Sequence, residues 1–189
     1  MNGNLYKPLR KQHLEIRLLK ILVPNKLDSV LNCTLEIVHL DRAPKYKALS
    51  YAWGNPSMTA EILVNEHPFQ TTLNLKAALQ NFRDTIPGIR LWVDAICVNQ
   101  NDLAERGHQV QLMKSIYSRA EEKYVWLGIQ SNDSDKAIDF MELLAARYRD
   151  CIARAPVGGK AEFGTFESTV SWDVVKSFAA LERLLVRPW

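Results

Sequence analysis

The chain has 189 residues, of which 47% are hydrophobic and 24% are charged, and its formal net charge is +3. These proportions are close to those of ordinary globular proteins, so they exclude a disordered, collagen-like or coiled-coil chain. A charge this close to zero gives no indication of nucleic-acid binding. No apolar run is long enough to span a membrane and no signal peptide is apparent, so we expect a cytoplasmic domain without membrane contact.

The three cysteines, Cys33, Cys97 and Cys151, are widely spaced and form no C-x-x-C pair. An odd number of isolated cysteines argues against a disulfide framework. No histidine pair has the spacing of metal ligands. We therefore expect reduced thiols and no metal site.

The first part of the chain alternates apolar and polar residues between turn residues, a pattern typical of β-strands. The expected strands are residues 14–22, 33–40, 46–53, 60–64 and 68–72. The last two flank Asn65-Glu66, so we expect them to form a short hairpin.

From Asn74 onward the apolar residues have helical spacing. Asn74 is the expected cap of a first helix, and Gly88 ends it. Further helices are expected at about residues 103–120, 134–148 and 172–186, and short apolar strands at 91–93 and 123–127.

This alternation of strands and helices predicts an α/β fold with a mostly parallel central sheet flanked by helices. We expect a single domain over residues 1–189. Within it, residues 1–45 would add strands to an α/β core at residues 46–189.

Polar residues gather where the predicted strands end, which is the edge at which parallel sheets bind ligands. Asp94 directly follows the strand at 91–93, and Asn99 and Gln100 come shortly before the next helix. The segment Ser50–Gly54 ends an earlier strand. Together these segments could present a carboxylate, amides and a helix N-terminus to one ligand.

The same region also has a purely structural interpretation. Asp102 and Glu105 have the spacing of a helix N-cap and its partner three residues later. Arg106 could pair with a neighbouring acid, and the amides could satisfy only loop backbone groups. Trp53, Trp92 and Trp126 fit the core better than a stacking surface, and Trp53 is the best candidate for an exception.

Other catalytic motifs are absent from the sequence. It contains no phosphate loop, no dinucleotide-binding glycine pattern and no nucleophile elbow. Cys97 and a histidine could act as nucleophile and base, but a buried structural cysteine is the favoured interpretation. An ordinary hydrolase therefore has no supporting motif.

Four short segments occur in the order of a known family pattern. They are Tyr46–Gly54 (YKALSYAWG), Asn74–Leu79 (NLKAAL), Leu91–Gln100 (LWVDAICVNQ) and Val125–Gly128 (VWLG). In these segments the chain resembles the fungal heterokaryon-incompatibility (HET) domain family.

The resemblance implies a domain that triggers fungal cell death when genetically different hyphae fuse. It also implies a distant relation to Toll/interleukin-receptor (TIR) domains and hence a TIR-like, flavodoxin-like sheet. Some TIR domains cleave NAD with the help of a glutamate, so NAD or a related nucleotide is a possible substrate here. The implied partners are a second copy of the domain or an incompatibility or NLR-type protein.

The family pattern continues past the R-x-W that this chain has at Arg187-Pro188-Trp189, and it ends in a glutamate. The resemblance therefore implies a domain truncated at its C-terminal end, with the usual catalytic acid outside these residues. Asp94 and Glu105 are the catalytic candidates that remain. The expected ligand-binding residues are Ser50, Trp53, Gly54, Asp94, Asn99, Gln100 and Arg106. The alternative is a non-catalytic module that kills by assembling with itself or a partner.

Overall fold

The computed structural model describes residues 5–10, 14–23, 30–53, 55–129 and 134–154. Gly54 and the helix expected at 172–186 lie outside these residues. The chain divides into two compact units, residues 1–128 and residues 129–188, and each is considered by itself.

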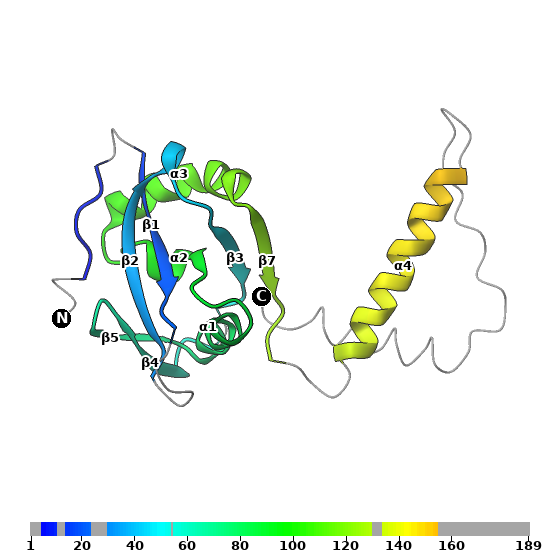
Figure 1. Ribbon diagram of the computed structural model, residues 1–189, viewed down its shortest axis with the longest axis horizontal. Coiled ribbons are helices and arrows are strands. Elements are labelled where there is room, and N and C mark those ends of the chain that lie inside the picture. The colour runs from blue at the N-terminus through cyan, green and yellow to red at the C-terminus, as the bar shows by residue number, and fades with distance from the viewer. Residues whose placement is uncertain (1–4, 11–13, 24–29, 54, 130–133, 155–189) are drawn as a thin grey trace. The chain divides into compact units, whose positions relative to one another are not determined.

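The first unit is built on one sheet, which has seven strands in the part of the chain described (Figure 1). The strands are β1 (Glu15–Ile21), β2 (Asn32–His39), β3 (Lys47–Tyr51), β4 (Thr59–Val64), β5 (His67–Thr72), β6 (Arg90–Trp92) and β7 (Glu122–Trp126). Their order across the sheet is β5-β4-β2-β1-β6-β3-β7. The strands expected from the sequence are all present, and no end differs from the prediction by more than two residues.

The sheet is mixed rather than mostly parallel. The pairs β2–β4, β3–β6 and β3–β7 are parallel, whereas β1–β2, β1–β6 and β4–β5 are antiparallel. The α/β class is confirmed, and the parallel part of the prediction holds for one half of the pairs. The alternation of residue types indicates which side chains of a strand are buried. It does not indicate whether the neighbouring strand runs parallel or antiparallel.

The helices of the first unit are α1 (Leu73–Thr85), α2 (Asp94–Cys97) and α3 (Leu103–Arg119), with a 3-10 turn at Leu40–Arg42. Helix α1 packs against β4 and β5, and the short α2 packs against β1. The sequence does not predict helix α2, because four residues are too few to show a helical periodicity. The second unit contains α4 (Ser134–Arg154), which covers the expected helix at 134–148.

Strand β1 lies at the centre of the core. Ile16, Leu18, Leu19 and Ile21 are fully buried, as is Trp92 on the neighbouring β6. Figure 1 shows β1 and β2 running side by side through the first unit. The N-terminal strands are therefore central to the sheet.

Helices α1 and α3 differ in how well their buried faces could be predicted. The apolar stripe of α1 is buried as its spacing predicts. On α3, however, Val110 is 58% exposed, while Glu105 and Gln109 are buried. Helical spacing predicts that Val110 lies on the buried apolar stripe with Met113 and Ile116. That prediction is wrong at Val110, because the buried polar side chains of Glu105 and Gln109 occupy part of the inner face.

The hairpin of β4 and β5 turns at Asn65 and Glu66 as expected. Both residues have positive φ, 50° and 65° respectively. Positive φ at both central residues is the geometry of the two-residue turn that matches the twist of a hairpin, and Asn adopts it readily.

Candidate functional site

A pocket lies between the end of β3, strand β5 and the loop that joins α2 to α3. Its volume is about 360 Å³. It is lined by Tyr6, Tyr51, Trp53, Pro56, Thr59, Pro68, Phe69, Gln70, Thr71, Thr72, Ala95, Asn99, Gln100 and Asn101. We call this cavity the aromatic pocket, because rings and neutral polar groups make up most of its wall.

Asp94 is joined to the wall of the aromatic pocket through Trp53. Its carboxylate accepts a hydrogen bond from the backbone N–H of Ala95 at 2.8 Å and another from the Trp53 side chain. Burial raises the pKa of Asp94, and these hydrogen bonds oppose that shift. Trp53 itself is 47% exposed, which agrees with its being the best candidate for a tryptophan outside the core.

Asn99 and Gln100 are held in fixed orientations by neighbouring backbone groups. The Asn99 Oδ1 accepts a hydrogen bond from the N–H of Asn101 at 3.2 Å, and the Gln100 Nε2 donates to the carbonyl of Asp94 at 2.9 Å. The Asn99 Nδ2 and the Gln100 Oε1 take no part in these two bonds. They provide a donor and an acceptor at one edge of the pocket.

Glu105 lies in a different environment, a buried ion pair with Arg17 of β1. Its two oxygens are 2.6 Å and 3.0 Å from the guanidinium nitrogens, and it also accepts from the N–H of Asn99 at 2.8 Å. Arg17 donates further bonds to the carbonyls of Cys97 and Lys7. Glu105 is not among the residues that line the aromatic pocket, so its direct effect is on the loop that carries Asn99.

The capping interpretation of Asp102 and Glu105 is confirmed for one half of the motif. The Asp102 carboxylate accepts from the N–H of Glu105 at 2.9 Å, which caps α3. The return bond of a capping box is replaced, because the N–H of Asp102 donates to the carbonyl of Asn99. Glu105 is left free to pair with Arg17.

Ser50 and Arg106 are not part of the aromatic pocket. Ser50 is exposed on β3 and hydrogen-bonds with Tyr117. Arg106 is exposed on α3. Gly54 lies outside the described residues. Of the predicted site residues, the structure therefore brings together Trp53, Asp94, Asn99 and Gln100.

Several residues that form the pocket wall are not predicted from the sequence. Tyr6 comes from the N-terminal segment and donates to the carbonyl of Ile96, 90 positions away, at 3.0 Å. Phe69 and Gln70 come from β5. No local pattern marks these residues as ligand contacts, because only the folded sheet brings them beside the α2–α3 loop.

Cys97 and Cys33 are buried thiols, as the structural interpretation expects. Burial raises the pKa of each to about 12. Such a thiol is neither ionised nor accessible, so it is a poor nucleophile. Within the described residues, no group of three His, Cys, Asp or Glu side chains could hold a metal ion. None of the helices described is long and apolar enough to cross a membrane.

Comparison with known proteins identifies the class to which this fold and its strand-end motifs belong. The family model described as heterokaryon incompatibility protein (HET) matches residues 46–189. The chain belongs to the HET domain family.

A named relative is heterokaryon incompatibility protein 6, OR allele, of Neurospora crassa. It is 32% identical over 167 residues, a match that covers 79% of this chain and 25% of the relative. The chain thus spans about a quarter of the length of that protein. No solved structure matches this chain.

Proposed function

We propose that this chain is a cytoplasmic signalling domain of the fungal incompatibility response, which triggers cell death when genetically different hyphae fuse. Membership of the HET family supports the proposal, as does the name of the Neurospora relative. The proposed partners are a second copy of the domain or an incompatibility or NLR-type protein.

The aromatic pocket is the proposed ligand site, and NAD or a related nucleotide is the proposed ligand. The observation that carries this proposal is that Trp53, Asn99 and Gln100 line one cavity. The carboxylate of Asp94 is hydrogen-bonded to Trp53. An aromatic wall can stack on a planar base, and the fixed donor and acceptor suit the edge of a base or an amide.

The charge of the lining indicates which end of a nucleotide would enter. Among the described residues that line the aromatic pocket there is no Lys or Arg. The N-cap of α1, Thr72, does line the pocket, but Lys and Arg are the side chains that bind phosphate through charge-assisted hydrogen bonds. We therefore propose that a ring enters the pocket and that the phosphates remain at its mouth.

If the ligand is cleaved, Asp94 is the carboxylate that we propose takes part in the reaction. Hydrolysis of NAD breaks the bond between the ribose carbon and the nicotinamide nitrogen, and nicotinamide leaves with the bonding electron pair. Water then adds to the ribose carbon and gives up a proton. A nearby carboxylate stabilises the positive charge that develops on the ribose. In the proposal Asp94, which is hydrogen-bonded to the lining residue Trp53 but does not itself line the pocket, turns toward the bound ribose to take this role, while Glu105, already paired with Arg17, positions the loop.

The test is incubation of the chain with NAD, with nicotinamide release measured over time. Release that falls by about tenfold or more in Asp94→Asn, while Asp84→Asn is unchanged, supports the catalytic role. Asp84 is an exposed carboxylate on α1 and serves as the matched control. Absence of both NAD binding and nicotinamide release at micromolar concentrations of the assembled protein contradicts the proposal.

The second candidate function is a non-catalytic module that acts by assembly. It is favoured by the exposed apolar side chains of Trp53, which lines the aromatic pocket, and of Met58 and Leu73, the chain neighbours of the lining residues Thr59 and Thr72. Trp53, Met58 and Leu73 are 47%, 52% and 42% exposed, and the N–H of Leu73 bonds to the carbonyl of Met58 at 3.0 Å. Apolar side chains grouped at a surface are typical of contact sites for another protein.

The two functions predict different behaviour of the same variants. Under assembly, Met58→Ser with Leu73→Ser abolishes both self-association and killing, whereas a folded Asp94→Asn still kills. Under the nucleotide proposal, Asp94→Asn loses killing while it still associates. Sedimentation velocity together with a cell-death assay in the fungus distinguishes these outcomes.

A further inference from the structure

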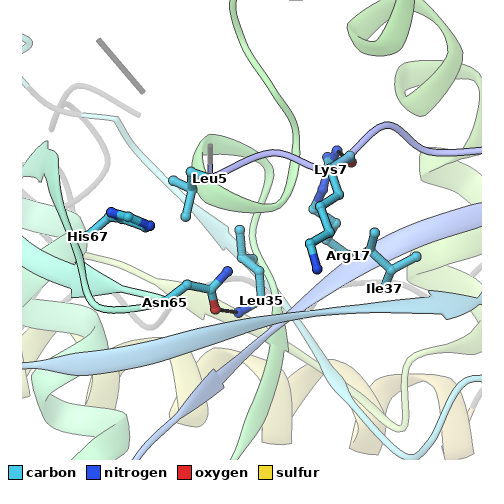
Figure 2. A pocket seen from close by; sticks show the side chains of 7 residues that line it. All are labelled: Leu5, Lys7, Arg17, Leu35, Ile37, Asn65 and His67. Atoms are coloured by element: carbon cyan, nitrogen blue, oxygen red, sulfur yellow. Dashed lines mark hydrogen bonds between the residues drawn. The ribbon is translucent and has the colours of Figure 1, made fainter. Parts of the chain in front are cut away.

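A second pocket lies on the other side of the N-terminal segment, and no part of the proposed function uses it. Its volume is about 490 Å³. Leu5 and Lys7 line this cavity, whereas Tyr6 between them lines the aromatic pocket. The remaining lining residues are Arg17 of β1, Leu35 and Ile37 of β2, and Asn65 and His67 of the β4–β5 hairpin. We call it the β2 pocket (Figure 2).

The polar groups of the β2 pocket are nitrogen-bearing side chains. Lys7 and His67 line it from the N-terminal segment and the hairpin, and Asn65 lies beside Leu35 of β2 (Figure 2). The Asn65 Oδ1 accepts a hydrogen bond from the N–H of Leu35 at 2.9 Å. That bond fixes the amide so that its Nδ2 turns away from β2, as Figure 2 shows. Asn65 therefore presents a donor to the cavity.

The electrostatic balance of the β2 pocket favours an anion with one negative charge. Glu105 balances the charge of Arg17 through their ion pair. The described lining contains Lys7 as a further cation and no Asp or Glu. The Nε of Arg17 is buried without a hydrogen-bond partner, and Arg17 is only 1% exposed. A buried N–H without a partner is costly unless some group accepts from it.

The rest of the lining is apolar. Leu5, Leu35 and Ile37 come from three positions around the cavity, and Ile37 is 39% exposed. We propose that the β2 pocket binds a small organic carboxylate with a short hydrocarbon body. Its oxygens accept from Lys7 and Asn65, and its hydrocarbon lies on the leucine and isoleucine side chains. This site is independent of the nucleotide proposed for the aromatic pocket.

Hexanoate is the probe, titrated into the whole chain by isothermal calorimetry. Hexanol has the hydrocarbon without the charge, acetate has the charge without the hydrocarbon, and inorganic phosphate tests a different anion. The proposal expects saturable binding of one hexanoate per chain, tighter than that of the other three compounds.

Asn65→Asp is the sharpest variant. An aspartate tolerates the positive φ of this turn and can still accept from Leu35, but it replaces the donor with a negative oxygen. Hexanoate is expected to bind about tenfold more weakly to Asn65→Asp and to Lys7→Gln. Lys114→Gln removes an exposed lysine of α3 and is expected to bind like the wild type.

Thermal unfolding without ligand shows that each variant is folded before it is titrated. Because Lys7 is exposed, Lys7→Gln decides the question if Asn65→Asp does not fold. No saturable hexanoate binding at millimolar concentration overturns the proposal. So does binding of hexanol, acetate or phosphate as tight as that of hexanoate, or wild-type affinity in both Asn65→Asp and Lys7→Gln.

Discussion

Glu105 illustrates how one carboxylate can support a site without facing it. It joins β1 to α3 through Arg17, and it holds the N–H of Asn99 in the loop that lines the aromatic pocket. Tyr6 stacks its ring on the same guanidinium, with 4.9 Å between the ring centroid and the Arg17 Cζ. The buried pair therefore orients two walls of the pocket from behind.

Glu105→Gln is expected to lower the free energy of unfolding by about 3–5 kcal/mol, because it leaves the buried Arg17 charge without its partner. Urea unfolding followed by circular dichroism measures the loss. The double variant Arg17→Met with Glu105→Leu removes both charges and is expected to lose less than the single variant. A single variant as stable as the wild type would show that the pair contributes nothing to the fold.

Asp94 gives the domain a pH dependence whose sign follows from its raised pKa. Burial raises the pKa of this carboxyl above the ordinary 3.8. At a pH between 3.8 and the raised pKa, the folded state therefore binds more protons than the unfolded state. The contribution of Asp94 to stability is therefore greatest at low pH and falls as the pH rises through the folded pKa.

Asp94→Asn is expected to remove this contribution while keeping an oxygen that accepts from Ala95 and Trp53. Relative to the wild type, the variant should gain stability as the pH rises from the ordinary pKa of 3.8 through the raised pKa of the folded state, and the gain should then level off. Urea unfolding of both proteins over this range measures the difference, in which the other titrating groups cancel. A difference that is constant with pH would mean that Asp94 titrates normally in the folded protein.

At the scale of the elements, the side chain of Asn74 links α1 by hydrogen bonds to β7 and to the end of β3. Its Nδ2 donates to the carbonyl of Ala52, just after β3, at 2.8 Å, and its Oδ1 accepts from the Trp126 Nε1 on β7 at 2.9 Å. The expected role of Asn74 as helix cap is wrong, because Thr72 caps α1 by accepting from the N–H of Leu75. The amide of Asn74 instead supplies a donor and an acceptor between strands.

Asn74→Ala is expected to lower the free energy of unfolding by about 1–3 kcal/mol, because the Ala52 carbonyl and the Trp126 indole lose their partner. Thermal or urea unfolding measures the change. Asn81→Ala, at an exposed position of the same helix, controls for helix propensity. An equal effect of the two substitutions would contradict the role assigned to Asn74.

The elements themselves were largely predictable, and their connections were not. Residue alternation predicts β1 and β2, and apolar spacing predicts the buried face of α1, because both depend on nearby residues. The antiparallel pairing of Ile16 with Val38, or the bond from Tyr6 to Ile96, depends on residues far apart in the chain. The same limit applies to the site. Trp53, Asn99 and Gln100 follow from their position after strands, whereas Tyr6 and Phe69 do not.

At the scale of the first unit, the region matched by the family model does not coincide with the sheet. The match begins at residue 46, yet β1 and β2 lie between β4 and β6 in the strand order. Strand β1 pairs with both β2 and β6 and supplies four fully buried side chains to the core. Without these two strands, β4 and β5 have no hydrogen-bonded connection to the rest of the sheet.

A chain of residues 46–189 is therefore expected not to fold cooperatively, although it contains the whole region matched by the family model. Removal of β1 takes Ile16, Leu18, Leu19 and Ile21 out of the core and leaves β6 unpaired on one side. Thermal unfolding by circular dichroism and the dispersion of amide proton signals compare this chain with residues 1–189. Addition of a separate peptide of residues 1–45 should recover part of the signal dispersion, since the missing strands fit between β4 and β6. A sharp unfolding transition in the shorter chain alone would show that its remaining strands form a stable sheet without β1 and β2.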